Sequence, residues 1–297
     1  MQAYIFLDNW VFSMLSDEKL RQRLICFLRT NGYTTILTSL ALTELYNPGW
    51  TQAPGPDRVE RAVNLLSQVP CIIVEPREVY AAEIEADLQP VQKLPVKFDL
   101  EDMERSMRAE VLRRLLRRDP LFLEQGHDIQ LWADNVAIAK MRWLEEVQSI
   151  IENACGSGYL LRDPRGRLSL PAEGEEWFLY SLDFRHTQPD RIDAILRSHL
   201  ERRASGAPFM PTAIRLSSLY FLHTYVGIDR SERIKRLGSD IVDMYHLSLA
   251  AYCAAFTTDK SMFRMFQAVR RSGVTLSCRV MTKTMLEEAM LTPHDPS

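Results

Sequence analysis

Short apolar runs of strand length alternate with amphipathic helical patterns in the first part of the chain. Residues 3–7 (AYIFL), 34–38 (TTILT) and 71–76 (CIIVEP) form three such runs. The segment SLALTELYN, which follows the second run, carries leucines at helical spacing. This alternation is typical of an α/β fold with a parallel sheet.

Helical periodicity replaces the strand-length runs in the middle of the chain. Apolar residues recur at helical spacing from residue 78 to about residue 236, most regularly over residues 128–154. Residues 156–177 are rich in turn formers and predict a loop or hairpin, while residues 190–204 and 211–226 predict further helices.

Strand and helix patterns return near the C-terminus. A helix is predicted to start at Asp240, with Ser239 as its cap, and the apolar run at residues 254–258 (AAFTT) predicts a strand. Residues 261–271 predict another helix. We therefore expect a sheet domain in two halves, residues 1–76 and 211–297, separated by a mostly α-helical insertion or cap over residues 77–210.

Acidic residues stand where these predicted strands end. Asp8 directly follows the first strand, and Asp259 directly follows the run at residues 254–258. The carboxyl ends of parallel strands meet at one sheet edge, where open α/β sheets hold their ligands. We therefore expect both carboxylates at that edge.

Further acids are predicted to reach the same edge from helix starts. Glu44 falls within the first two turns of the helix after residues 34–38, and Asp243 lies one turn after Asp240. Converging carboxylates repel one another and raise each other's pKa unless a cation lies between them. Hard oxygen ligands suit Mg²⁺ or Mn²⁺, and two such ions about 4 Å apart support phosphodiester hydrolysis.

Each acid also has a purely structural interpretation. Asp240 and Asp243 favour the positive end of a helix dipole, Glu44 can be a solvated helix acid, and Asp259 can cap the helix that follows it. Asp8 is not needed as a helix cap, because its neighbour Asn9 could cap the following helix instead. The joint occurrence of the acids favours the metal site.

The same segments resemble the three acidic motifs of PIN-domain ribonucleases. The pieces are YIFLDNW, ILTSLALTELYNP and SDIVDMYHLSLAAYCAAFTTDKSMF, and they cover about the first 75 and the last 80 residues. The resemblance implies a three-layer core of a parallel sheet flanked by helices, and cleavage of RNA with Mg²⁺ or Mn²⁺. It assigns catalytic and metal-ligand roles to these acids: Asp8, Glu44, Asp243, Asp259 and, as a fifth candidate, Asp240. It gives supporting roles to Asn9 and to Thr257, which would orient the last acid. The chain departs from the pattern after the first acid, which is commonly followed by a small polar residue and then Asn, whereas here Asn9 comes at once and the bulky Trp10 follows it.

A basic segment at residues 105–119 is the candidate nucleic-acid surface. It contains six arginines and a single glutamate, Glu110, and such a helix can bind a phosphate backbone. We assign RNA contacts to Arg113, Arg114, Arg117 and Arg118. The alternative is a solvated basic face whose arginines complement the helix dipole.

Composition limits the classes of function. The chain has 297 residues, a formal net charge of -3 and no apolar stretch of the length that a bilayer span needs. It lacks a basic segment leading into an apolar one at its start, so we expect a cytoplasmic protein without a membrane partner. Its five cysteines show no CxxC spacing and indicate neither a disulfide framework nor a zinc site.

Two functions follow from these patterns. The first is a metal-dependent endoribonuclease acting on single-stranded or structured RNA, with DNA as an open alternative. The second is a catalytically inactive PIN-like protein that binds RNA or a protein partner. The resemblance also implies a homodimer.

Overall fold

A six-stranded, mostly parallel sheet forms the centre of the computed structural model. The structure describes residues 3–38, 41–42, 45, 56–86, 89–116, 148–149, 151–156, 158, 160–169, 201, 205, 211–226, 242–271 and 274–291. The strands are β1 (Ala3–Phe6), β2 (Tyr33–Leu37), β3 (Cys71–Ile73), β4 (Phe98–Asp99), β7 (Ala255–Thr257) and β8 (Arg279–Met281). Their order is β4-β3-β2-β1-β7-β8, and only β4 runs antiparallel to its neighbour.

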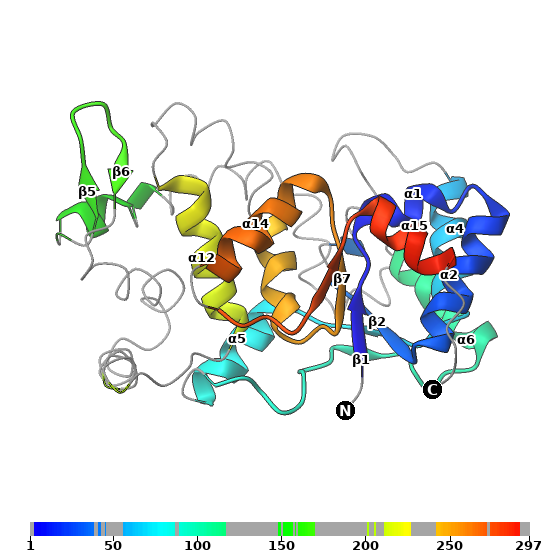
Figure 1. Cartoon of the computed structure of the whole chain (residues 1–297). Coiled ribbons are helices and arrows are strands. Elements are labelled where there is room, and N and C mark those ends of the chain that lie inside the picture. Colours follow the sequence, from blue (N-terminus) through cyan, green and yellow to red (C-terminus); the bar gives the residue numbers. More distant parts are fainter. Residues whose placement is uncertain are drawn as a thin grey trace.

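Helices cover both faces of this sheet (Figure 1). On one side lie α1 (Asn9–Met14), α2 (Glu18–Thr30), α4 (Pro56–Leu66), α6 (Arg105–Leu116) and α15 (Lys283–Leu291). On the other side lie α5 (Pro76–Glu85), α12 (Ala213–Tyr225), α14 (Lys260–Arg271) and the 3₁₀ helix η1 (Leu249–Ala251). The protein is therefore an α/β protein, as the alternation of patterns predicted.

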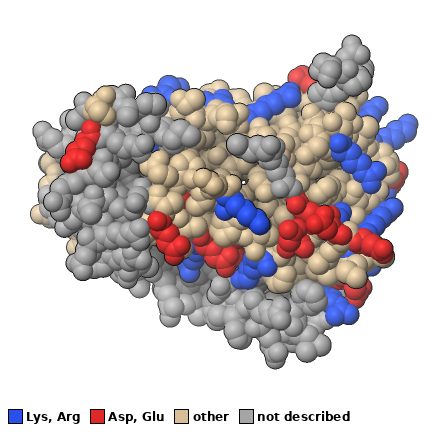
Figure 2. All heavy atoms as spheres, turned by 90° about the horizontal axis from the view of Figure 1, so that it is seen from below, with Lys and Arg blue, Asp and Glu red and all other residues tan. Residues whose placement is uncertain are grey.

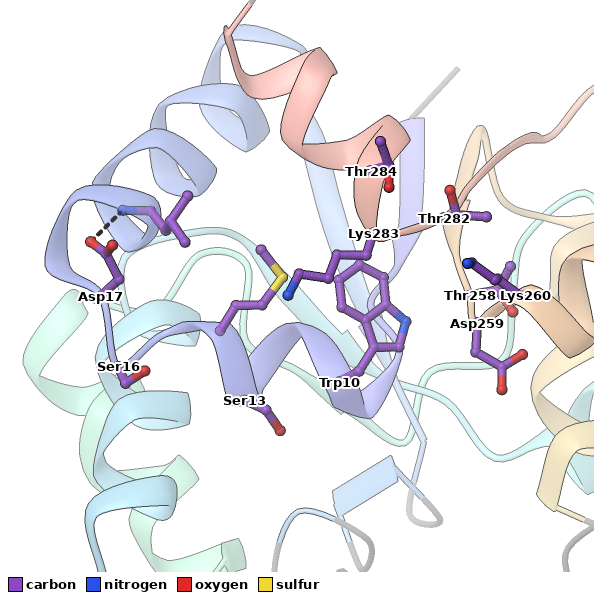
Figure 3. A pocket seen from close by; sticks show the side chains of 12 residues that line it. Trp10, Ser13, Ser16, Asp17, Thr258, Asp259, Lys260, Thr282, Lys283 and Thr284 are labelled. Atoms are coloured by element: carbon purple, nitrogen blue, oxygen red, sulfur yellow. Dashed lines mark hydrogen bonds between the residues drawn. The ribbon is translucent and has the colours of Figure 1, made fainter.

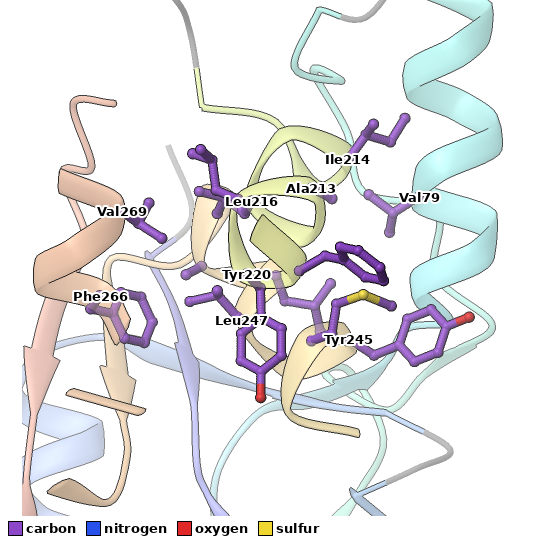
Figure 4. Close-up of a cluster of buried hydrophobic side chains, with 14 of the residues drawn as sticks. Val79, Ala213, Ile214, Leu216, Tyr220, Tyr245, Leu247, Phe266 and Val269 are labelled. Atoms are coloured by element: carbon purple, nitrogen blue, oxygen red, sulfur yellow. The ribbon is translucent and has the colours of Figure 1, made fainter. Parts of the chain in front are cut away.

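Alternate strand residues supply the two cores, because successive side chains of a strand point to opposite faces. Phe6 and Phe256 face the first core, and their rings stack with centroids 4.6 Å apart. Figure 4 shows side chains of this core, among them Val79 of α5, Tyr220 of α12 and Phe266 of α14. Ile5, Leu7 and Ala255 face the second core, with α1, α2 and α4. The near-continuous apolar character of these strands follows from burial on both faces.

The strands that follow β1 lie on both sides of it in the sheet, and this arrangement determines where a ligand site can form. From β1 the chain continues through β2 to β3 in one direction, whereas β7 and β8 lie in the other. The strand order therefore reverses between β1 and β7, and open α/β sheets bind their ligands outside the carboxyl ends of the strands at such a point.

The predicted strands at residues 3–7, 34–38, 71–76 and 254–258 are confirmed as β1, β2, β3 and β7. The predicted helices at residues 211–226 and 261–271 correspond to α12 and α14. The hairpin is also present, as β5 (Leu161–Arg162) and β6 (Leu168–Ser169). The sequence patterns did not predict β8 or α15.

Part of the predicted insertion belongs with the sheet. Strand β4 pairs with β3, and α6 packs against α4, although both segments fall within residues 77–210. The helical pattern at residues 128–154 and the predicted helix at residues 190–204 lie almost wholly outside the described residues, so the division into two halves and an insertion stays a prediction. No described helix is long and apolar enough to cross a bilayer.

Candidate functional site

The buried hydroxyl of Thr257 joins the ends of β1 and β7. It accepts a hydrogen bond from the backbone N–H of Asp8 at 2.7 Å and lies 3.2 Å from the carbonyl oxygen of Phe6, to which it donates. These two bonds fix the backbone where Asp8 leaves the sheet. The resemblance assigned Thr257 to the last acid, Asp259, but the structure shows its hydroxyl bonded to the first.

Asp8 is the N-cap of α1. Its Oδ1 accepts the backbone N–H of Asn9 at 2.6 Å, and its carbonyl oxygen accepts the N–H of Val11 at 3.0 Å. The expectation that Asp8 has no capping role was therefore wrong, because Asn9 is already the first helical residue. Asn9 supports the carboxylate through this backbone N–H group.

Asp259 holds the same position at the neighbouring strand. It follows β7 after the buried Thr258, and its Oδ1 accepts the backbone N–H of Met262 at 2.7 Å, in the first turn of α14. The capping interpretation of Asp259 is thus confirmed. Since β1 and β7 are hydrogen-bonded neighbours, two N-cap carboxylates follow adjacent strands at the point where the strand order reverses.

The two carboxylates act on each other electrostatically. Burial raises the pKa of Asp8 to about 6, and the negative charge of Asp259 adds to this rise. Hydrogen bonding from Asn9, Trp10 and the backbone of Asp259 lowers the pKa of Asp8 and offsets part of it. The ionised site is therefore costly at neutral pH, and a bound cation would remove that cost.

These two side chains fit a hard divalent cation. A carboxylate offers about four lone-pair positions, and the hydrogen bonds from Asn9, Trp10 and the backbone of Asp259 use three of those of Asp8. Mg²⁺ commonly binds proteins through one or two carboxylates together with substrate phosphate and water. Among the described residues, which leave out Glu44 and Asp240, no three His, Cys, Asp or Glu side chains form a cluster of metal-ligating geometry.

Asp243 lies half-buried on a helical segment, residues 242–248, whose buried hydrophobic residues belong to the core that packs against α5, α12 and α14. One turn later, the buried ring of His246 packs on Phe6, with centroids 4.7 Å apart, and its Nε2 lies 3.4 Å from the hydroxyl of Thr38, just after β2. Burial lowers the pKa of His246 to about 3, so the ring is neutral. The structure thus brings Asp8 and Asp259 together and places the helix of Asp243 beside β1. Glu44 and Asp240 lie outside the described residues.

A cavity of about 610 Å³ opens beside Asp259 (Figure 3). Trp10 and Ser13 of α1 lie on one side of it, and Lys283 extends across it from the start of α15. The sequence patterns singled out neither Lys283 nor the threonines beside it, because β8 is only three residues long. The weak signal was the apolar pair Val280 and Met281, which ends β8. Thr282 then links that strand to the start of α15.

The predicted arginine surface is largely engaged in internal contacts. Arg108 is buried and donates to five backbone carbonyl groups, those of Ser67, Val69, Leu100, Glu101 and Met103. It therefore cannot bind phosphate, although it belongs to the basic segment from which Arg113, Arg114, Arg117 and Arg118 were assigned to RNA.

Arg113 pairs with Glu60 at 3.3 Å and Arg114 with Glu110 at 3.0 Å, both at half-exposed positions where an ion pair adds little stability. Arg117 and Arg118 lie outside the described residues. On the face drawn in Figure 2, basic and acidic side chains of described residues are interspersed.

No family model matches the chain, and no significant match was found among curated proteins or solved structures.

Proposed function

We propose that the protein is a metal-dependent nuclease with a PIN-like α/β core that hydrolyses phosphodiester bonds in RNA. The main support is the pair of carboxylates, Asp8 and Asp259, at the carboxyl ends of the two strands where the strand order reverses. Their mutual repulsion and the burial of Asp8 favour a divalent cation.

In this proposal the chain holds and orients the site. Asp8 and Asp259 supply negative oxygens, and Thr257 fixes the backbone of Asp8 against β7. Bound Mg²⁺ or Mn²⁺ supplies Lewis-acid chemistry, lowering the pKa of a water and neutralising charge on the departing oxygen. Glu44, Asp240 and Asp243 are proposed as further ligands on the strength of the family resemblance.

The test is cleavage of mixed single-stranded RNA and DNA by purified protein in Mn²⁺, in Mg²⁺ and in EDTA. Wild type should cut only with metal, and Asp8→Asn and Asp259→Asn should lose cutting while staying folded. Asp163→Asn is the matched control, since Asp163 also accepts a backbone N–H but lies in the β5–β6 hairpin, away from the sheet. Cutting that survives in both Asp8→Asn and Asp259→Asn would refute the proposal.

One observation favours the second candidate, an inactive PIN-like protein that binds RNA or protein. Both acids already serve as N-caps, and that role needs no metal. This alternative predicts that wild type neither cuts nucleic acid nor gains melting temperature when Mn²⁺ or Mg²⁺ is added.

A further inference from the structure

The cavity beside Asp259 has walls of two chemical kinds. Trp10, Met14 and Leu20 form an apolar wall from α1 and the start of α2. Trp10 is half-buried, and its side chain also interacts with the carboxylate of Asp8, whose pKa it lowers. A half-buried indole beside an open cavity offers a flat surface on which another ring can stack.

The opposite wall carries hydroxyl and ammonium groups. Lys260 begins α14 and Lys283 begins α15, and both are exposed. Three threonines complete this wall, namely Thr258, Thr282 and Thr284. The positive ends of two helix dipoles add to the charge of the lysines.

The lining carries two acidic and two basic side chains, and both acids serve as helix caps. Asp17 accepts the backbone N–H groups of Lys19 and Leu20, at 2.8 and 3.2 Å, and caps α2, while Asp259 caps α14. Lys283 meets Glu287 at 3.9 Å, and both side chains are exposed. An ion pair of that length and exposure is weak, so Lys283 can turn toward an anion.

We infer that this cavity is a nucleotide subsite for single-stranded RNA, with a base against Trp10 and the adjoining phosphate at Lys283 and Lys260. The inference rests on the proposed function, since the ligand is taken to be a unit of the substrate next to the cleaved bond. Aromatic platforms beside basic groups are the usual means of binding single strands. The volume of about 610 Å³ is that of a small-ligand site.

The subsite gives Trp10 a specific role. Asp8, two positions before Trp10, belongs to the carboxylate pair. Asp259 is the other member of that pair and also lines the cavity. A base held on the indole would therefore place the next phosphate of the strand near the two acids. Trp10 is then a positioning residue for the RNA strand. A bulky side chain two positions after Asp8 is therefore compatible with nuclease activity.

The test is binding of a fluorescein-labelled hexaribonucleotide in EDTA, where no cleavage occurs, followed by fluorescence anisotropy. Trp10→Ala should weaken binding by roughly tenfold, the loss expected of one stacked base, and Trp10→Phe should restore most of it. Lys283→Ala should weaken binding more at low salt than at high salt. The control is Arg271→Ala, which removes an exposed cation at the far end of α14 and should change nothing.

Two outcomes separate this inference from the proposed function. If Trp10→Ala and Lys283→Ala bind the strand as wild type does, the subsite is refuted, even when wild type cuts RNA with Mn²⁺. If both variants lose binding but wild type cuts nothing, the subsite stands and the nuclease fails. Lys283 is exposed, so its variant keeps the test valid should Trp10→Ala unfold.

Discussion

Replacing Asp8 by asparagine should stabilise the metal-free protein at neutral pH. The substitution removes a negative charge that is costly in the fold, yet it keeps an oxygen that can cap α1, and asparagine caps helices about as well as aspartate. The expected gain follows from the raised pKa of Asp8, whose main cause is burial and whose second cause is the charge of Asp259.

The size of the effect can be worked from that pKa. The folded protein raises the pKa of Asp8 from 3.8 to about 6, a difference of about two units, and one unit corresponds to about 1.4 kcal/mol. The folded state therefore binds the proton more tightly than the unfolded chain does. Wild-type stability should fall as pH rises from about 4 to above 6, by up to about 3 kcal/mol.

The assay is urea unfolding in EDTA at several pH values between 4 and 8. Asp8→Asn should match wild type near pH 4 and exceed it by up to about 3 kcal/mol above pH 7. Adding Mn²⁺ should reverse the order, because a ligand that binds only the folded state stabilises wild type and not the variant. A variant that is less stable than wild type at pH 7.5 in EDTA would refute the reasoning.

Three further predictions concern polar side chains with buried hydrogen bonds. Thr257→Val removes a hydroxyl bonded to two backbone groups and should cost about 1–3 kcal/mol in urea unfolding, whereas Thr257→Ser should keep both stability and Mn²⁺ affinity. Burial raises the pKa of Glu83 to about 7, so this carboxyl also destabilises the fold as pH rises from about 4.5 to 7, and Glu83→Gln should flatten the stability profile in that range. Arg108→Met leaves five buried or part-buried carbonyls without their donor and should cost about 3 kcal/mol or more. The melting temperature should therefore fall several times further than in Arg114→Met.

The positions of Asp8 and Asp259 could be predicted from the sequence because both follow apolar strand-length runs. Parallel strands send their carboxyl ends to one edge, so a residue directly after a strand has little freedom to lie elsewhere. The same logic does not reveal side-chain partners. Thr257 bonds across to β1 rather than to the acid two residues later, because its hydroxyl lies beside the strand that pairs with β7.

Other features depended on tertiary contacts that no local pattern encodes. Arg108 looks like its neighbours on a basic helix, yet it faces the loop after α4 and is buried there. The cavity is lined by three segments that are far apart in sequence, and the last of them follows β8, a strand too short for a periodicity to appear. Side chains from such separate elements cannot be brought together by sequence spacing alone.

The bond between Asp8 and Thr257 spans 249 positions of the chain, and this separation has a consequence for synthesis. As a ribosome makes the protein, β1, β2 and β3 are synthesised well before β7, which carries the bonding partner of Asp8. The carboxylate pair therefore cannot assemble on a nascent chain until β7 has left the exit tunnel. In the proposed nuclease, the site would stay incomplete while the first three strands are already made.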